Sequence, residues 1–485
     1  MITTNYIVVS ITFNKLLPVV LYFIIIAAIG IYSARFSSKG VSEFFIGGRQ
    51  MGRFVVALSA VASGRSAWLL IGVSGLAYLQ GISAIWAVAG YIIVEFLLFL
   101  FLAPRLRYYS EKYDCITLPD FFAMHLNDKK GYLRIFLIVV FVIFMVTYVS
   151  SQIMAGGKSF YTHFQISENT GLIITAFVIL LYTITGGFLA VSLTDVFQAF
   201  VILLALTILP LFAIIDFGSI GSLIKSLQEI DPKFFDLFRM PGLTIIGLLA
   251  IGLGSPGNPH IAIRYMSIKD PSQFKWTAIV GTIWNVLMAI GAILTGIVGR
   301  AYFPMKDLLP NADNENIYIS LSNLLLSPFF AGIILSSLFA AIMSTADSQL
   351  LVAASSIVRD FYQKILLKDK IIENKKLTRL SRISVFIIIM LSIMLAFMIK
   401  EQILWFVLFA WGGLGASIGP ALILSIFWKK TTYQGVIAGL VTGTLVVFIW
   451  KNLPVFKNTG LYELIPAFFL STAVIVIVSF FTKRN

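Results

Sequence analysis

The chain has 485 residues, of which 59% are hydrophobic and 12% charged, and its mean hydropathy is +0.95. Soluble domains carry about 25% charged residues, so the composition excludes a soluble protein and predicts an all-α protein that crosses a membrane many times. The net charge is +14, and the Lys and Arg residues lie mostly in the loops between apolar segments. This distribution reflects membrane topology, so we expect no nucleic-acid partner. A single cysteine, Cys115, excludes an intrachain disulfide, and three scattered histidines lack metal-ligand spacing.

Windows of about 20 apolar residues predict about thirteen transmembrane helices in a lipid bilayer. They centre on residues 14–34, 52–82, 84–104, 133–156, 168–187, 195–216, 241–263, 277–299, 325–357, 381–399, 402–428, 433–450 and 462–482. The longest polar segment, residues 359–382, is interpreted as a solvated cytoplasmic loop, with an amphipathic surface helix as the alternative.

The charges of the loops predict the orientation of the chain. Of the 36 Lys and Arg residues, 25 lie in one set of loops and ten in the other, with Arg65 inside a span. Because Lys and Arg accumulate in cytoplasmic loops, we expect a multi-pass protein of the cytoplasmic membrane with its N-terminus outside and its C-terminus in the cytoplasm.

Two of the predicted helices are interrupted. The first break is "ASGRS" at residues 62–66, and the second is "GLGSPGNPH" at residues 252–260. Unwound backbone at membrane depth occurs only where it is buried in protein or lines a cavity. Paired broken helices are typical of inverted-repeat transporters that bind substrate and ions near the midplane. Two Pro/Gly kinks without a ligand are the alternative.

Polar side chains inside the spans are candidates for an ion site. Ser344, Asp347 and Ser348 stand at i, i+3 and i+4, so they share one helix face. An intramembrane carboxylate is a functional candidate by default, and sodium, a hard cation, prefers oxygen ligands. Asp195 begins another span, where it is equally well explained as an acidic helix cap.

Six blocks of the sequence resemble a known family. In order they are "FFIGGRQMGRFVVALSAVASGRSAWLLIGVSGLAYLQGIS", "LPDFF", "YTITGGFLAVSLTDVFQ", "GLGSPGNPHIAIRYM", "MSTADSQLLVAASSIVRDFY" and "FAWGGLGASIGPALILSIFWKK". They resemble the sodium/solute symporter family, most closely its sodium/proline symporter branch, over about residues 40–450. The resemblance implies one transmembrane domain over residues 1–485 with the leucine-transporter-type five-plus-five inverted repeat. The repeats would be residues 52–216 and 241–428, with an extra helix at 14–34 and two more at 433–482.

The resemblance also implies the roles of individual residues. The main sodium site would use Ala62, Arg65, Ala341, Ser344 and Thr345, the residues of the first break through their backbone. A second sodium site, present in some members, would use Asp195, Asp347 and Ser348. The substrate would contact Ser66, Trp68, Tyr148, Gln152, Ser255 and Pro259.

The chain departs from the proline branch at both breaks. That branch typically reads "ASDMSGW" where this chain reads "ASGRSAW", so Gly64 replaces an acidic residue and Arg65 is a cation beside the sodium site. It also reads "WGLGYFGQPH" where this chain reads "IGLGSPGNPH", so Ile251 and Ser255 replace two aromatic residues. A pocket with more room and one more hydroxyl suits a larger or more polar solute than proline.

These observations predict a secondary transporter, with no enzymatic activity and no organic cofactor, that works as a monomer. Sodium is the expected coupling ion, and a small organic solute is taken up by alternating access. The alternatives are a sodium-independent or proton-coupled transporter in which Arg65 replaces a cation, and a membrane sensor of solutes. An arginine near mid-depth costs roughly 3 kcal/mol, so Arg65 needs a partner, and we expect Asp347 or Asp195, with a solute carboxylate as the alternative.

Overall fold

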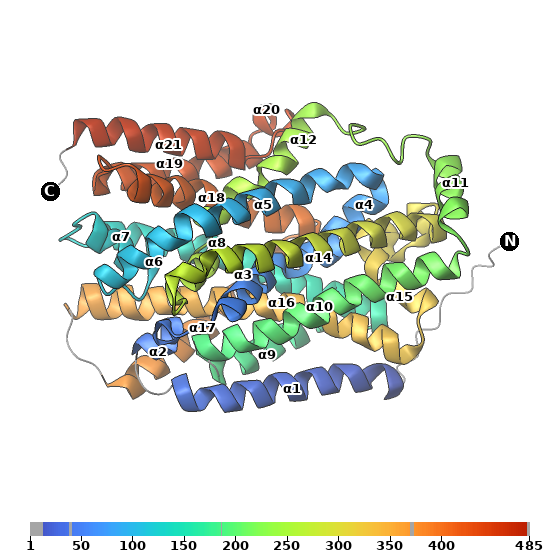
Figure 1. Cartoon of the computed structure of the whole chain (residues 1–485), viewed down its shortest axis with the longest axis horizontal. Helices are drawn as coiled ribbons and strands as arrows, with labels where there is room; N and C mark the ends of the chain where they lie inside the picture. The colour runs from blue at the N-terminus through green and yellow to red at the C-terminus, as the bar shows by residue number, and fades with distance from the viewer. Residues whose placement is uncertain (1–12, 38–40, 186, 369–372, 483–485) are drawn as a thin grey trace.

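The computed structural model of the chain describes residues 13–37, 41–185, 187–368 and 373–482. These residues are almost entirely helical, and the main β-type contact among them is an isolated bridge between Met51 and Ile268. Most of the long helices run along the longest axis of the molecule (Figure 1). The principal helices are α1 (Phe13–Ser37), α3 (Arg53–Ala67), α5 (Ile85–Leu97), α8 (Tyr132–Phe164), α9 (Glu168–Thr185), α10 (Phe188–Asp216), α12 (Gly242–Leu249), α13 (Pro259–Ser267), α14 (Phe274–Tyr302), α16 (Pro328–Ser355), α17 (Asn374–Met398), α18 (Ile403–Phe427), α19 (Tyr433–Asn452) and α21 (Leu464–Phe481).

Shorter helices join these long ones. They are α2 (Val41–Ile46), α4 (Ser74–Gln80), α6 (Ala103–Lys112), α7 (Leu118–His125), α11 (Ile220–Ile230), α15 (Ile317–Leu325) and α20 (Pro454–Lys457). The predicted solvated loop, residues 359–382, is helical at both ends. The π-helix Ser356–Leu366 covers its start, and α17, which begins at Asn374, covers its end.

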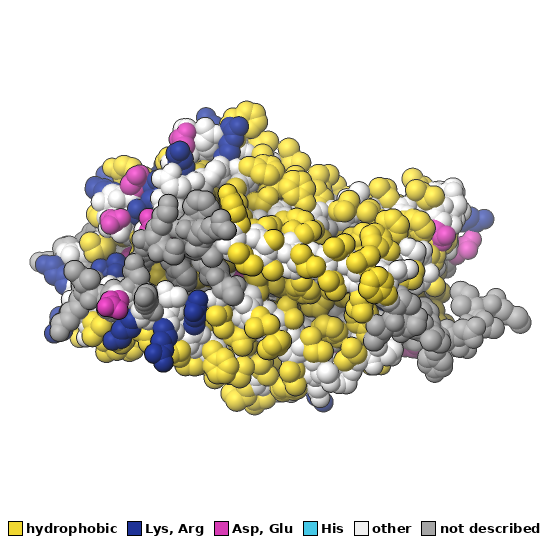
Figure 2. Space-filling view, turned by 90° about the horizontal axis from the view of Figure 1, so that it is seen from below, with side chains coloured by type: hydrophobic (Ala, Val, Ile, Leu, Met, Phe, Trp, Pro, Cys, Tyr) yellow, Lys and Arg dark blue, Asp and Glu magenta, His cyan; other side chains and the backbone are white. Residues whose placement is uncertain are grey.

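The described residues contain ten helical runs that are long and apolar enough to cross a membrane, one of which, Arg53–Lys112, is 60 residues long. Two shorter apolar helices, Glu168–Ile184 and Gly242–Gly257, add to them. Hydrophobic side chains cover the middle of one long face, and most of the visible Lys and Arg side chains gather at one end of it, on the left in Figure 2. The all-α membrane fold is confirmed, whereas the number of thirteen crossings stays a prediction.

Both predicted helix breaks are present. In α3 the backbone of Ser66 leaves the helical region, with φ 29° and ψ −172°, and a π-helical turn, Trp68–Val73, follows. The second break is a 3-10 helix, η5 (Ala250–Gly257), which joins α12 to α13 through the extended residue Asn258. Glycine, serine and proline make both breaks possible because they form weak helix interiors.

The second break packs closely against α18. A Cβ atom on Gly257 would lie 2.4 Å from the carbonyl oxygen of Leu414, and one on Gly254 would lie 2.1 Å from Nε1 of Trp411. The same indole nitrogen donates a hydrogen bond of 2.8 Å to the carbonyl of Ile251. Glycine at these positions therefore lets two backbones approach, and Trp411 satisfies a carbonyl that the 3-10 geometry leaves free.

Arg65 is fully buried and joins three helices. Its guanidinium forms an ion pair with Glu95 of α5 and donates from Nε to Oδ1 of Asn285 in α14 at 2.7 Å. Asn285 in turn donates to Oε2 of Glu95 at 2.9 Å. The ring of Tyr91 lies against the guanidinium, 3.8 Å from centroid to Cζ, in cation–π geometry.

The expected pairing of Arg65 with Asp347 or Asp195 is therefore wrong. Ser63 of α3 points toward Asp195, with its hydroxyl 3.2 Å from the carboxylate. Arg65 stands two residues further along, and a helix turns by about 200° over two residues, so its side chain points to the opposite side. Glu95 is the partner because α5 packs on that side.

We expect Arg65→Met to destabilise the protein strongly. The substitution leaves the carboxylate of Glu95, which is 3% exposed, buried without its cation, and breaking a buried pair in this way costs about 3–5 kcal/mol. The double variant Arg65→Met/Glu95→Gln removes the stranded charge and should recover most of the loss. The measurement is the midpoint of thermal unfolding in detergent for each purified variant.

Arg53→Met is the matched control. Arg53 lies on the same helix but is exposed, where its side chain contacts Gln273 and Trp276, so its loss should change the midpoint little. A double variant as unstable as Arg65→Met alone would contradict the assignment of Glu95 as the partner.

Candidate functional site

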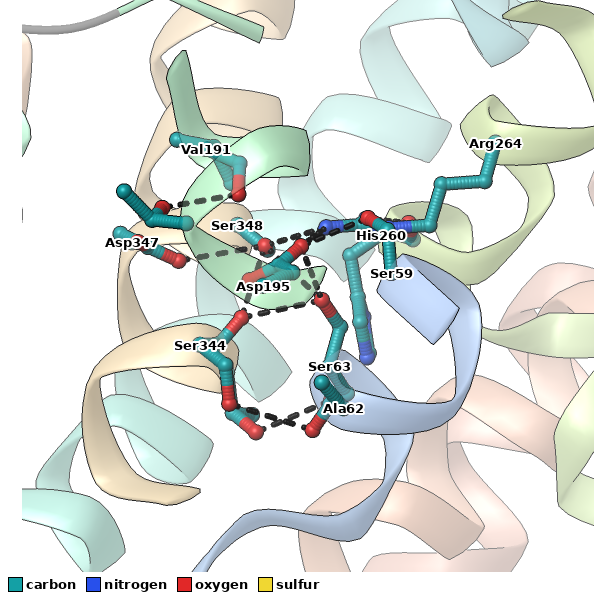
Figure 3. A network of polar contacts seen from close by, with 12 residues as sticks. Ser59, Ala62, Ser63, Val191, Asp195, His260, Arg264, Ser344, Asp347 and Ser348 are labelled. Carbon is teal, nitrogen blue, oxygen red and sulfur yellow. Dashed lines mark hydrogen bonds and ion pairs between the residues drawn. The ribbon is translucent and has the colours of Figure 1, made fainter. Parts of the chain in front are cut away.

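The residues of the predicted main sodium site come from the first break and from α16. The hydroxyl of Ser344 donates to the carbonyl of Ala62 at 3.2 Å and lies at the same distance from the carbonyl of Ala341. The hydroxyl of Thr345 donates to the carbonyl of Ser63 at 2.9 Å. All of these side chains are fully buried. The structure thus gathers two hydroxyls and three carbonyls between two helices, the kind of oxygen donor that a hard cation prefers. Figure 3 shows Ser344, Ala62 and Ser63 of this group.

Two details differ from the predicted main site. The carbonyl that faces Thr345 belongs to Ser63, a residue that was not among the predicted ligands. The carbonyl of Arg65 accepts the backbone N–H of Trp68, and its side chain points toward α5 and α14. Arg65 therefore shares a helix with the site without placing its positive charge inside it.

A second polar cluster adjoins the first one and contains Arg264, which lies one residue beyond the predicted helix at 241–263. Nη2 of Arg264 lies 2.7 Å from Oδ2 of Asp195 and 2.6 Å from Oγ of Ser348, and its Nε donates to Ser59 at 2.6 Å. Ser59 also donates to Asp195 at 2.6 Å. Arg264 is 1% exposed and reaches this cluster from α13 (Figure 3). Two of the three residues predicted for a second sodium site, Asp195 and Ser348, thus contact a guanidinium.

Asp347 completes the second cluster. Its Oδ1 accepts from Ser348 at 3.2 Å, and its Oδ2 has no hydrogen-bond partner among the described residues. Oδ1 of Asp195 is likewise without a partner in the described part of the chain. Two fully buried carboxylates with one arginine carry a formal charge of −1. The two clusters meet at Ser63, whose hydroxyl contacts both the carbonyl of Ser344 and the hydroxyl of Ser348.

One signal could have found Arg264. The predicted apolar window, residues 241–263, ends one residue before Arg264 and therefore places the arginine in a cytoplasmic loop. A helix that starts at Pro259 nevertheless continues to Ser267, and Arg264 stands four residues after His260 on it. Proline at the first helical position is a start signal, and it would have extended this helix past the arginine.

Four of the predicted substrate residues surround the first break. The hydroxyl of Tyr148 lies 3.5 Å from that of Ser66, and the side-chain oxygen of Gln152 accepts the backbone N–H of Ala67 at 3.1 Å. The indole of Trp68 donates to the carbonyl of Gly64 at 3.4 Å. These contacts satisfy backbone groups that the kink at Ser66 exposes.

The other two predicted substrate residues lie at the second break. Pro259 starts α13, and the ring of its neighbour His260 stands edge-on to that of Tyr148, with 6.2 Å between the centroids. Ser255 is buried and its hydroxyl has no partner among the described residues, as is also true of both ring nitrogens of His260 and of Oδ1 of Asn258. Buried polar atoms normally find partners, so this group offers hydrogen bonds to a bound molecule.

The comparisons with known proteins agree with this geometry. The model of the sodium:solute symporter family matches residues 44–443. Sodium/proline symporter 2 of Staphylococcus saprophyticus is 38% identical over 476 residues, which cover 96% of this chain and 92% of that protein. The osmoregulated proline transporter OpuE of Bacillus subtilis is 38% identical over 466 residues, with 96% and 94% covered.

Two solved structures share the fold. A Na+-coupled sialic acid symporter in a substrate-bound outward-open state superposes with a TM-score of 0.82 at 16% identity, with 98% of this chain and 99% of that chain covered. Mhp1, a nucleobase-cation-symport-1 family transporter in a closed conformation, gives 0.58 at 14% identity, with 93% and 98% covered. The family match extends over most of the sequence and includes both breaks and α16. This chain belongs to the sodium:solute symporter family and is a membrane-spanning, sodium-coupled symporter of a small solute.

Proposed function

We propose that this protein couples the entry of one sodium ion to the uptake of a small zwitterionic amino acid, and that proline is the first solute to test. The observation that carries the coupling is the meeting of the Ser344 and Thr345 hydroxyls with the carbonyls of Ala62 and Ser63. The relatives named as proline transporters support the solute class. The five-plus-five repeat, the outside N-terminus, the cytoplasmic C-terminus and action as a monomer belong to the same proposal.

Sodium would bind where α16 meets the break in α3. The hydroxyls of Ser344 and Thr345 donate to the carbonyls of Ala62 and Ser63. A cation at this point is attracted by all of these oxygens, and the hydroxyl hydrogens turn away from it. Because the carbonyls are available only while α3 is kinked beside α16, sodium would stabilise one arrangement of the two helices.

Arg264 would serve as the fixed cation of the second cluster. Its guanidinium contacts Asp195 and Ser348, two of the three residues predicted for a second sodium. One mobile sodium per cycle is then sufficient, because one charge moving through 100 mV contributes about 2.3 kcal/mol. That free energy corresponds to a roughly 50-fold accumulation of a neutral zwitterion, before the sodium gradient adds its own share.

The solute would bind between the two breaks, beside Tyr148. Its charged groups would be held by unwound backbone and helix ends, as in other transporters with broken helices. Ser255, Asn258 and His260 offer buried polar atoms without partners in the described part of the chain. These atoms favour a second candidate solute, an amino acid with a polar substituent, over one with an apolar ring alone.

We expect Ser344→Ala/Thr345→Ala to abolish sodium-dependent uptake while the protein still inserts in the membrane. The double variant removes two oxygen ligands and leaves an apolar wall beside the carbonyls. The measurement is the initial rate of proline uptake into proteoliposomes with and without an inward sodium gradient. Ser355→Ala is the control, since Ser355 lies on the same helix and bonds only to the carbonyl of Val352. Equal uptake in the double variant and the control would refute the site.

Reconstituted protein should move one elementary charge per neutral zwitterion. The assay compares solute flux and charge flux under a clamped potassium potential. Arg264→Met removes the fixed cation and leaves Asp195 and Asp347 buried together, so sodium dependence should steepen toward two ions per solute, while Arg264→Lys should retain one. Two charges per solute in the unmodified protein would overturn the role given to Arg264, as would the same ratio in Arg264→Met.

The solute is tested by competition. Saturable, sodium-dependent uptake of proline is expected, and 4-hydroxyproline should compete because Ser255 can pair with its hydroxyl. In Ser255→Ala the advantage of hydroxyproline over proline should fall by roughly 2- to 10-fold, the value of one hydrogen bond. If neither compound is transported, an uptake screen across larger polar amino acids takes the place of the proline assay, and the solute part of the proposal fails.

A further inference from the structure

A cavity of about 460 Å³ lies apart from the candidate site, at the end of the molecule where α18 begins and α19 ends. We call it the side cavity and define it by Glu401, Trp405, Lys451, Lys457, Tyr462 and Glu463, which line it together with residues of α12. None of the residues of the sodium or substrate sites lines it. Its volume is within the range of about 300–1,000 Å³ that small-molecule sites occupy.

The charges around the side cavity are only partly paired. Nζ of Lys451 lies 2.8 Å from Oε2 of Glu401, and it also stands over the ring of Phe409 at 4.4 Å. Lys457 and Glu463 form no ion pair with any described residue. One cation and one carboxylate therefore line the same cavity without an ion-pair partner in the described part of the chain, an arrangement that complements a molecule with one charge of each sign.

An indole ring stands beside these charges. Trp405 is 41% exposed and lines the side cavity, and the face of an indole attracts an ammonium group strongly, including substituted ones. Trp450 also lines the side cavity and is held in place, since its ring stacks on Phe456 at 4.6 Å and its Nε1 donates to the carbonyl of Leu461 at 3.1 Å. The side cavity thus has one fixed and one partly exposed indole in its lining.

The side cavity is connected to the second break through Tyr462. Its hydroxyl donates to the carbonyl of Leu408 in α18, and a Cβ atom on Gly247 of α12 would lie 3.1 Å from its own Cβ. The segment that carries Tyr462 follows α20, which lies beside α12 in Figure 1. A molecule in the side cavity therefore touches α12, which continues directly into η5, and α18, which packs against η5.

We propose that the side cavity is a second binding site, for a small zwitterion with a substituted ammonium group. Glu463 and Trp405 hold the ammonium group, and Lys457 holds the carboxylate. Binding does not require sodium, because the protein supplies both counter-charges. The occupied site braces α12 against α18 and so changes the rate of transport through the central site.

Ligand-observed saturation-transfer NMR on the full-length protein in lipid nanodiscs tests this site. The probes are glycine betaine and L-proline, titrated in potassium chloride without sodium. Both faces of a nanodisc are accessible, so the orientation of the protein does not matter. Saturable transfer to the methyl groups of betaine and to the ring protons of proline is expected. The absence of saturable transfer from both probes overturns the proposal.

Two variants and one control locate the binding. Glu463→Gln and Lys457→Met should each weaken sodium-free binding about tenfold, the loss typical of one hydrogen bond to a charged group. Glu229→Gln is the matched control, because Glu229 is an exposed carboxylate on α11 that does not line the side cavity. Lys457 is exposed, so its variant remains informative if Glu463→Gln fails to fold. Unchanged affinity in Lys457→Met and in a folded Glu463→Gln refutes the site.

The test also separates the two sites. In Ser344→Ala/Thr345→Ala the sodium-free signal should persist, while any additional binding that sodium induces in the unmodified protein is lost. Persistence of the sodium-free signal together with loss of transport supports both proposals. Loss of the sodium-free signal in that variant would place the probe in the central site and overturn the second one.

Discussion

A lipid bilayer offers no hydrogen-bond partners, and this single constraint organises the protein. Every carbonyl that leaves a helix at a break, and every charge within a span, has to be satisfied by another part of the chain. In the first break, Trp68, Gln152 and the hydroxyls of α16 take the freed backbone groups. In the second break, Trp411 takes a carbonyl from η5. The neighbouring helices therefore supply hydrogen-bond partners to the backbone groups that the breaks expose. The buried polar atoms that still lack a partner among the described residues indicate where a bound molecule fits.

Two buried arginines meet this constraint in different ways. Arg65 pairs with Glu95 and Asn285 and ties α3 to α5 and α14. Arg264 pairs with Asp195 and Ser348 and ties α13 to α10 and α16. The residues around Arg65 join α3 to its neighbours on the side away from the predicted cation ligands. The residues around Arg264 lie against those ligands, so the charge of Arg264 acts on anything that binds between α3 and α16.

Much of this arrangement could be predicted from the sequence, because apolar length, glycine and proline leave local signatures. The helices and both breaks follow from such signatures, whereas the meeting of Ser344 with Ala62 was implied by the resemblance to the family. The ion pairs did not follow. Glu95 stands in an apolar run with no motif around it, and the direction of the Arg65 side chain depends on which neighbour packs on that side. Pairing between distant helices is a property of packing, which the spacing of residues along one helix does not encode.

The ion pair between Arg264 and Asp195 has a consequence for how the carrier moves. It links α13, which follows the second break, to α10, and separating a buried ion pair is strongly destabilising unless both groups find new contacts. A tilt of α13 away from α10 therefore has to break this contact before Arg264 and Asp195 can pair elsewhere. Such a contact favours two discrete arrangements of the helices over a continuous range of intermediate ones. Arrangements between these two would be sparsely populated, which would limit the passage of ions without solute.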